Sequence, residues 1–80
     1  LVAYSEIGRS HEGRAIPLLT ITRFASGKPE DKPAYWVDGN IHSVELSASS
    51  ACLYFVHWLL AHDGQDANVT RQLDTRTLYV

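Results

Sequence analysis

The hydrophobic pattern of this chain changes its period halfway along the sequence. Residues 34–38 (AYWVD) form a short, nearly continuous apolar run between a proline and a glycine, which is typical of a strand buried on both faces. In residues 44–61 the apolar side chains instead recur at i, i+3 and i+4, which predicts a helix with a wide apolar face. A buried strand that leads directly into a long helix indicates a crossover, so we expect an α/β fold.

The N-terminal half predicts two more strands. Residues 1–7 and residues 15–24 are rich in strand-forming side chains, and a turn with glycine and charged residues lies between them. Pro17 has no backbone N–H to donate, which places the start of the second strand near a sheet edge or at its first residue. Residues 26–33 (SGKPEDKP) hold two prolines, one glycine and four charges, which predicts a loop.

The C-terminal half predicts where the long helix begins and ends, and two further elements. Ser43 is the expected N-cap, and Glu45 lies in the expected first turn, where the helix dipole favours an anion. Residues 62–64 (HDG) are the expected end of this helix. Residues 67–73 indicate one or two helical turns, and residues 75–80 indicate a final strand. The expected order is therefore three strands, a long helix, a short helix and a strand.

Charge and hydropathy limit the classes of partner. The formal net charge is −2, and the seven basic residues are scattered, so we expect no nucleic-acid partner. The longest apolar stretch, residues 51–61, is interrupted by His57 and is shorter than the ~20 residues of a membrane span. We therefore expect no membrane partner. Cys52 is the single cysteine and is expected to act as a small buried hydrophobic residue.

His42 and Glu45 are the candidate metal ligands of the sequence. They lie three residues apart between the predicted strand and the predicted helix, where open α/β sheets place their ligand sites. An imidazole nitrogen and a carboxylate oxygen, each ~2.0–2.2 Å from the metal, suit a catalytic zinc that keeps one position open for water. The spacing alone also fits a purely structural interpretation, in which His42 caps the strand end and Glu45 satisfies the helix N-terminus.

Four segments of the chain form a wider pattern. Residues 7–14 (IGRSHEGR) contain an I-G-x-S-x-E-G-R turn, and residues 33–42 (PAYWVDGNIH) lead into His42. Residues 64–66 (GQD) and 73–77 (LDTRT) follow at the helix exit and in the last strand. In order and spacing this pattern resembles the M14 family of zinc carboxypeptidases, which are carboxypeptidase A/B-like, over nearly the whole chain.

The resemblance has implications for fold and domain organisation. It implies that residues 1–80 are the N-terminal portion of a single zinc carboxypeptidase-like catalytic domain. The implied fold is α/β, a phosphorylase/hydrolase-type sandwich with a mixed β-sheet and a crossover helix, incomplete in this fragment. The chain begins at Leu1 rather than methionine and ends within an apolar run, from which we also expect a piece of a longer protein.

The resemblance also implies a cofactor and site residues. It implies Zn2+, with His42 and Glu45 in the positions of the family's first two ligands. It implies no catalytic residue within the fragment, because the family's third ligand, its glutamate base and the residues that bind the substrate carboxylate have no counterpart here. Many members carry an arginine that contacts substrate where this chain has Val44, so Val44 is a candidate substrate-binding residue. Asp38 and Asn40 are candidates to support the ligands, although backbone capping by Asp38 and a turn role for Asn40 fit as well.

The implied function is hydrolysis of a C-terminal peptide bond by metal-activated water. The departure at Val44 leaves open a zinc-dependent small-molecule amidohydrolase or deacylase of the same superfamily. The expected substrate is therefore a peptide or a small amide. A non-catalytic α/β module that keeps the ligand pair is a further alternative.

Overall fold

The computed structural model describes residues 1–80, which form four strands and two α-helices. A short 3-10 turn, Pro29–Asp31, lies in the predicted loop, whereas another, Phe24–Ser26, begins at the residue predicted to end the second strand, which stops at Ile21. The order along the chain is the predicted one, and the elements are β1 (Val2–Arg9), β2 (Ala15–Ile21), β3 (Ala34–Trp36), α1 (Leu46–His62), α2 (Ala67–Thr75) and β4 (Thr77–Tyr79).

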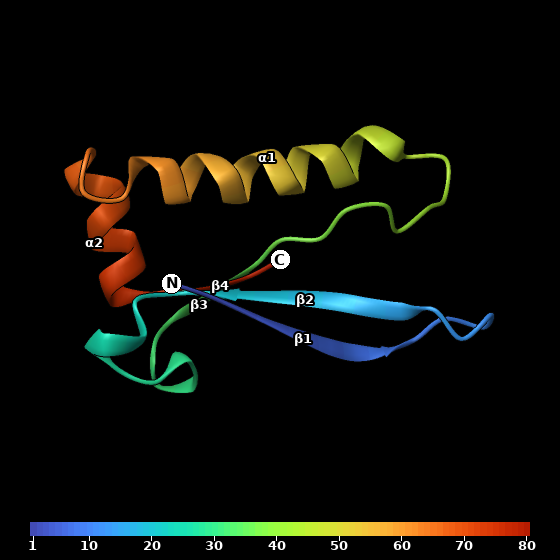
Figure 1. The fold of residues 1–80 in the computed structure, drawn as a ribbon, viewed down its shortest axis with the longest axis horizontal. Coiled ribbons are helices and arrows are strands. Elements are labelled where there is room, and N and C mark those ends of the chain that lie inside the picture. The colour runs from blue at the N-terminus through green and yellow to red at the C-terminus, as the bar shows by residue number, and fades with distance from the viewer.

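The four strands form one mixed sheet in the order β1-β2-β4-β3 (Figure 1). β2 pairs antiparallel with both β1 and β4, whereas β3 pairs parallel with β4. The parallel pair requires the crossover that α1 and α2 supply, because parallel neighbours cannot be joined by a tight turn. The α/β class and the mixed sheet with a crossover helix are therefore confirmed.

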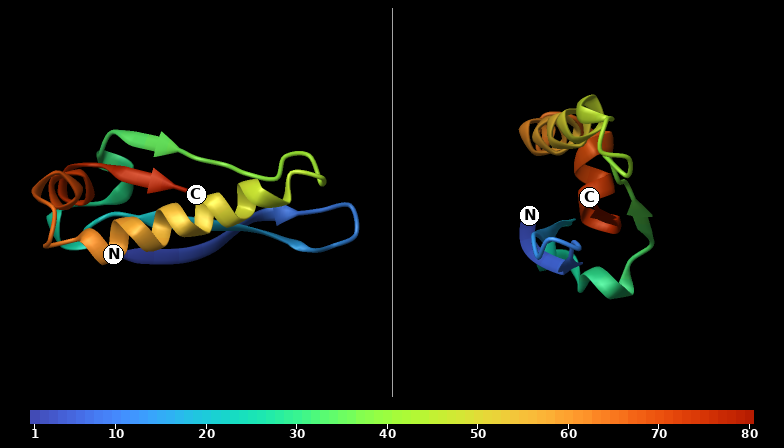
Figure 2. Two further views of the ribbon diagram at one scale, coloured as in Figure 1. Left: turned by 90° about the horizontal axis from the view of Figure 1, so that it is seen from above. Right: turned by 90° about the vertical axis from the view of Figure 1, so that its right-hand side faces the viewer.

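The helices and the sheet form two layers. α1 runs along one face of the sheet, and α2 stands at one end of the molecule (Figures 1 and 2). The turn between β1 and β2 and the loop between β3 and α1 lie at the opposite end from α2. Neither helix combines the length and the apolar character that crossing a membrane requires.

Pro17 lies where β2 has a single neighbouring strand. It faces Glu6 of β1, next to an irregularity in the register between Glu6 and Gly8. β4 pairs with β2 only further along, at Thr20 and Ile21. The missing N–H of Pro17 therefore removes no bond to β4, which confirms the predicted edge position.

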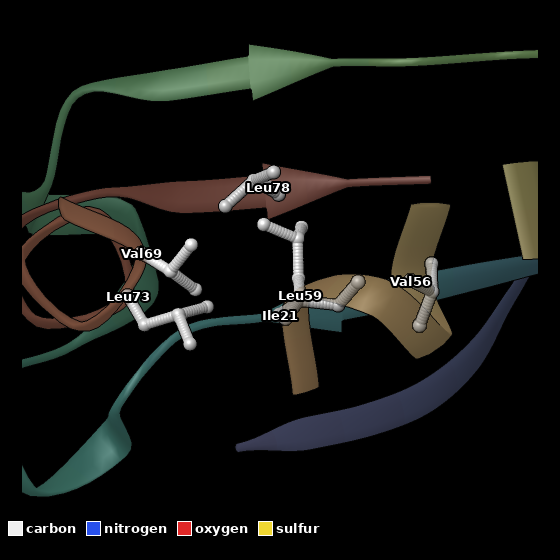
Figure 3. Close-up of a cluster of buried hydrophobic side chains, with 6 residues drawn as sticks. All are labelled: Ile21, Val56, Leu59, Val69, Leu73 and Leu78. Atoms are coloured by element: carbon white, nitrogen blue, oxygen red, sulfur yellow. The ribbon is translucent and has the colours of Figure 1, made fainter. Parts of the chain in front are cut away.

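A small apolar core joins the two layers (Figure 3). Only 8 of the 80 residues are buried, so the fold depends on few contacts. Val56 and Leu59 of α1, at helical spacing, point towards the sheet, as predicted from the pattern of residues 44–61. The buried apolar residues are Ile21, Val56, Leu59, Val69, Leu73 and Leu78.

The prediction that the strand at residues 34–38 is buried on both faces is wrong for this structure. All three residues of β3 are exposed, with Tyr35 at 54% and Trp36 at 57%. β3 is an edge strand with one neighbour, β4. The buried side chains of α1 contact the core that β2 and β4 supply, which leaves the aromatic residues of β3 uncovered.

The start of α1 also differs from the prediction. The helix begins at Leu46, so Glu45 is its N-cap residue rather than a member of its first turn. No side chain caps the helix, and Ser43 lies in the turn before it. The carboxylate of Glu45 instead contacts the backbone N–H and Nδ1 of His42, so it does not cap the helix. The predicted end is confirmed, since α1 stops at His62 and Gly64 adopts a positive φ of 77°.

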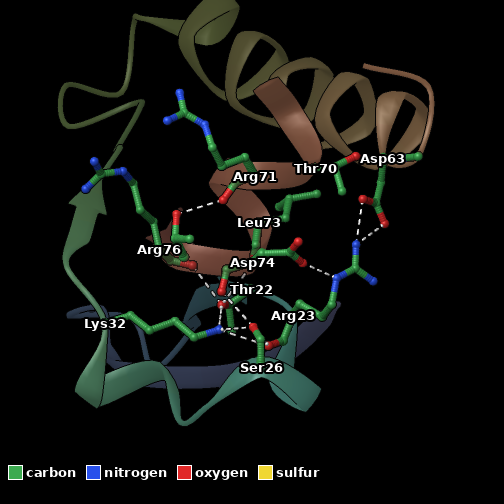
Figure 4. A network of polar contacts seen from close by, with 12 residues as sticks. Thr22, Arg23, Ser26, Lys32, Asp63, Thr70, Arg71, Leu73, Asp74 and Arg76 are labelled. Atoms are coloured by element: carbon green, nitrogen blue, oxygen red, sulfur yellow. Dashed lines mark hydrogen bonds and ion pairs between the residues drawn. The ribbon is translucent and has the colours of Figure 1, made fainter. Parts of the chain in front are cut away.

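A polar network fixes α2 against the end of β2 (Figure 4). The guanidinium of Arg23 donates to both carboxylate oxygens of Asp63, at 2.7 and 2.8 Å, and to Asp74. The ammonium of Lys32 donates to the hydroxyls of Thr22 and Ser26 and to the carbonyl of Arg23, at 2.8–2.9 Å. Charge-assisted hydrogen bonds of this kind are the stronger class, so the network compensates for the small apolar core.

Two apolar grooves remain open on the molecule. The first groove, of about 440 Å³, lies between β3, α1 and α2 and includes Trp36 and Trp58. The second groove, of about 860 Å³, lies between the β1–β2 hairpin and α1 and includes Ile7, Cys52 and Leu53. Cys52 is half-buried, short of the full burial expected from the sequence.

Candidate metal centre

The candidate site lies in the loop between β3 and α1, and Gly39 sets the path of that loop. A Cβ placed on Gly39 would stand 2.9 Å from the carbonyl carbon and oxygen of Ala48 and 3.0 Å from the Sγ of Cys52. Side chains essentially never pack that closely, so only glycine lets the chain leave β3 directly beneath α1. The close approach fixes the start of α1 relative to the end of β3.

Asn40 turns the chain after this close approach. Its φ of 64° lies in the left-handed region, which asparagine tolerates better than other residues with a side chain. The turn role expected for Asn40 is therefore present. Its Oδ1 is buried and accepts no hydrogen bond, so the amide has acceptor capacity that the surrounding residues leave unused.

His42 and Glu45 close the next turn by three contacts. The backbone N–H of Glu45 donates to the carbonyl of His42 at 3.0 Å, and the backbone N–H of His42 donates to Oε2 of Glu45 at 3.3 Å. Nδ1 of His42 lies 2.7 Å from Oε1 of Glu45. The two side chains predicted to converge therefore face one another at the end of the strand. Both are accessible, with 74% of the His42 side chain and 43% of the Glu45 side chain exposed.

The donor pair fits a zinc ion in chemistry and nearly in spacing. Imidazole nitrogen and carboxylate oxygen are both common zinc ligands, and two ligand atoms at ~2.0–2.2 Å from a tetrahedral ion lie about 3.4 Å apart. The observed 2.7 Å is a hydrogen-bond distance, so Nδ1 and Oε1 need to separate slightly. The proton shared by the two atoms must leave when a cation takes its place, because a ligand nitrogen needs its lone pair free.

Residues 1–80 bring no third donor to this pair. No group of three or more His, Cys, Asp or Glu side chains that could hold a metal ion is present in the structure. The side chains of Asp38 and Asn40 make no hydrogen bond to His42 or Glu45, so a supporting role for either stays a prediction. The zinc-ligand role of His42 and Glu45 and the substrate role of Val44 likewise stay predictions.

The remaining histidines lie away from the pair. His11 and His57 are exposed. His62, at the end of α1, accepts or donates a hydrogen bond at the carbonyl of Trp58 and stacks on the Trp58 ring at 4.2 Å.

The pattern analysis did not single out Gly39 or Arg23. Gly39 stands between a predicted strand and a predicted long helix, and a glycine at such a position often marks a close backbone approach, so the sequence did hold a signal for it. Arg23 had no such signal, because its partners Asp63 and Asp74 lie 40 and 51 residues away in sequence.

Comparison with known proteins identifies the family of the chain. The sequence profile described as zinc carboxypeptidase matches residues 1–80. Carboxypeptidase A1 of Homo sapiens is 35% identical over 80 residues, which cover 100% of this chain and 18% of that protein. Carboxypeptidase B of Homo sapiens is 34% identical over the same share of each chain. Metallocarboxypeptidase A of Trichophyton tonsurans is 35% identical over 77 residues, which cover 96% of this chain and 18% of that protein.

The chain belongs to the zinc carboxypeptidase family, M14, a family of metallopeptidases. The resemblance found in the four sequence motifs is therefore confirmed. The chain spans only 18% of the length of the relatives described above.

Proposed function

We propose that the full-length protein is a zinc-dependent metallocarboxypeptidase that hydrolyses a C-terminal peptide bond, with His42 and Glu45 as two of its zinc ligands. The observation that carries the proposal is the 2.7 Å approach of Nδ1 of His42 to Oε1 of Glu45 at the end of β3. Membership of the zinc carboxypeptidase family supports it, as does the similarity of the chain to carboxypeptidase A1 and carboxypeptidase B.

The turn prepares the two donors before a cation arrives. The backbone bond from Glu45 to His42 and the close approach at Gly39 hold both side chains beside one another, so little rearrangement is needed. Glu45 contributes negative charge and His42 a neutral nitrogen once its proton has left. When bound, zinc supplies a Lewis acid that polarises a carbonyl and lowers the pKa of a coordinated water towards about 7.

The proposal assigns the remaining machinery to sequence outside residues 1–80. Two donors leave a tetrahedral zinc without its third protein ligand, and the structure holds no three-residue group that could complete it. We place residues 1–80 in the N-terminal portion of one catalytic domain. The third ligand, the general base and the residues that bind the substrate carboxylate would all belong to the rest of that domain.

The test is metal content and turnover of the full-length protein and three variants. His42→Ala and Glu45→Gln should each lower zinc content by atomic absorption and lower kcat/KM on blocked dipeptides by more than about 100-fold, since even loss of a residue that supports a ligand costs 10–100-fold. His57→Ala is the matched control, because His57 is an exposed histidine on α1 away from the pair. Unchanged zinc content and turnover in Glu45→Gln would remove Glu45 from the site.

The same assay separates the alternatives left open by the sequence. A small-molecule amidohydrolase would bind zinc and hydrolyse N-acyl amino acids or small amides but leave blocked dipeptides intact. A non-catalytic module would hydrolyse neither class of substrate. If hydrolysis of blocked dipeptides is lost in both the His42 and the Glu45 variant, the result supports the metallocarboxypeptidase and neither alternative.

A further inference from the structure

The side of α1 that faces away from the sheet carries exposed apolar side chains and no acidic or basic residue. Leu46, Leu53 and Tyr54 are 73%, 63% and 67% exposed, whereas Val56 and Leu59 on the inner side are buried. The whole helix contains no aspartate, glutamate, lysine or arginine. A surface helix ordinarily carries charged residues on the side away from the core, and a helix that is apolar all round is a buried one. The composition of α1 therefore predicts that its outer side is covered in the assembled protein.

Six exposed residues form this outer face, which runs the length of α1. They recur at steps of three or four residues, so they lie along one side of the helix. In Figures 1 and 2 no other element lies on the side of α1 away from the sheet. The outer-face residues are Leu46, Ser50, Leu53, Tyr54, His57 and Ala61.

The rest of the domain has other surfaces of residues 1–80 to cover. β3 is an edge strand with exposed aromatic side chains, so a further strand beside it would extend the sheet. The face of the sheet opposite α1 carries no α-helix (Figure 2), and α/β sheets have helices on both faces. Domains consist of two or occasionally three layers, so these additions leave α1 as an outer layer. The cover of the outer face therefore comes from outside the domain.

The centre of the outer face fits a second copy of the same helix. A two-fold axis between Leu53 and Tyr54 lies near the middle of α1 and places two copies of the helix antiparallel. Leu53 of each copy then packs on Tyr54 of the other copy, so both central apolar side chains are buried in each chain. The cores of protein interfaces are depleted of charged residues and enriched in tyrosine, as this centre is.

The two flanks of the outer face match in the same arrangement. Each residue faces the one that lies equally far on the other side of the axis. Ser50 therefore faces His57, and a hydroxyl and an imidazole can share a hydrogen bond. Leu46 faces Ala61, so a large side chain lies beside a small one. The antiparallel helix dipoles also attract one another at both ends. An acidic or basic partner would gain no ion pair from α1, whereas a second copy gains these matched contacts.

We infer that the outer face of α1 is a self-association surface, on which two full-length chains pair antiparallel about a two-fold axis. A 17-residue helix is about 25 Å long, so the helix pair buries less area than a standard interface of about 1,600 Å². The dimer is therefore weak and depends on concentration. It holds the two His42–Glu45 pairs at opposite ends of the helix pair, because Glu45 directly precedes α1 in each chain.

The experiment measures the mass of the full-length zinc protein by sedimentation across a concentration series. The mass should rise from one chain to two. Leu53→Glu and Tyr54→Lys each place a charge in the centre of the interface, and each should raise the dimer Kd by about 30-fold or more, as loss of a central interface residue does. An equimolar mixture of the two variants should recover a Kd within about 3-fold of the wild-type value, because the introduced carboxylate and ammonium then face one another.

Ala25→Glu is the matched control for Leu53→Glu. It adds the same charge at an exposed position, in the Phe24–Ser26 turn on the far side of the sheet from α1 (Figures 1 and 2). Its dimer Kd should equal that of the wild type. The Tm of every variant is also measured at a dilution at which all chains are monomeric. Leu53→Glu and Tyr54→Lys should leave this Tm nearly unchanged, because exposed side chains contribute little to the stability of the single chain.

The outcomes decide the inference without reference to turnover. A wild-type protein that stays a single chain at every concentration overturns it. A Tm lowered in both monomeric variants shows that the rest of the chain covers α1, and also overturns it. A dimer Kd that is the same in all variants places the association on another surface, and a mixture that fails to recover the dimer excludes the antiparallel pairing. Either result overturns the inference. Since mass is read independently of zinc content and hydrolysis, failure of the proposed function is recognised separately.

Discussion

Gly39 and Ala48 lie in such close contact that a Cβ on Gly39 would stand 2.9 Å from the carbonyl of Ala48. Gly39 lies three residues after the end of β3, and Ala48 lies in the first turn of α1. The ligand pair lies between them in sequence. The distance between β3 and α1 therefore also sets the positions of His42 and Glu45.

Gly39→Ala should destabilise the fold and weaken metal binding together. The added methyl group meets backbone atoms of Ala48, which cannot move away without shifting α1. Overpacking of this kind costs about 1–3 kcal/mol of unfolding free energy. The shift of α1 also moves Glu45 relative to His42, so zinc affinity should fall. Denaturant unfolding and zinc titration of the full-length variant measure the two effects.

Gly8→Ala is the matched control for this substitution. A Cβ on Gly8 meets no atom within 4 Å, and its φ is not positive. We expect a change of less than about 0.5 kcal/mol and unaltered zinc affinity. Equal effects of the two substitutions would show that the close approach to Ala48 is unimportant.

The isolated chain of 80 residues should bind zinc weakly and show no peptidase activity. Two accessible donors leave the other coordination positions to water, and the structure supplies no third. Calorimetric titration should give an affinity far below that of the full-length protein. Sub-nanomolar binding by residues 1–80 would reveal a ligand that the structure does not bring to the pair.

Arg23→Gln should lower Tm by the same amount from about pH 6 to about pH 9. The pKa of Arg23 is raised above its ordinary value by its hydrogen bonds to Asp63 and then to Asp74. A group whose pKa is raised on folding contributes its full stabilisation at every pH below its unfolded-state pKa. This contribution is lost only as the pH rises through the folded-state pKa. Since arginine keeps its charge far above this window even in the unfolded state, where its pKa is at its ordinary value, no change is expected between these pH values.

Arg71→Gln is the control for the Arg23 variant. Arg71 is exposed on α2, and its guanidinium makes no hydrogen bond within the chain. The substitution removes the same charge and should leave Tm nearly unchanged. An Arg23→Gln effect that disappears towards pH 9 would contradict the assignment of the stabilisation to a permanently charged guanidinium.

Lys32→Met should cost about 1–3 kcal/mol of unfolding free energy, measured in urea. The ammonium is the shared donor to Thr22, Arg23 and Ser26, and methionine keeps much of the side-chain length without the charge. Lys28→Met, at an exposed position in the same loop, should change the free energy by less than about 0.5 kcal/mol. A similar loss in both variants would mean that loop charge rather than the three bonds stabilises the fold.

The sequence by itself predicted the order of the elements, the end of α1 and the pairing of His42 with Glu45. These features are local: hydrophobic period, turn residues and a three-residue spacing act within one or two turns of the backbone. The motif of residues 33–42 likewise lies in one continuous segment, so the family resemblance needed no tertiary contact.

Only the tertiary structure decided the burial of β3, the start of α1 and the Arg23 network. An apolar run such as residues 34–36 has the same pattern at a sheet edge as in a sheet centre, so its exposure depends on which strands pair beside it. Glu45 could serve the helix or His42, and the path through Gly39 brings it to His42. Arg23 meets Asp63 and Asp74 because the crossover returns α2 to the end of β2, and no local pattern records a contact across 40 residues or more.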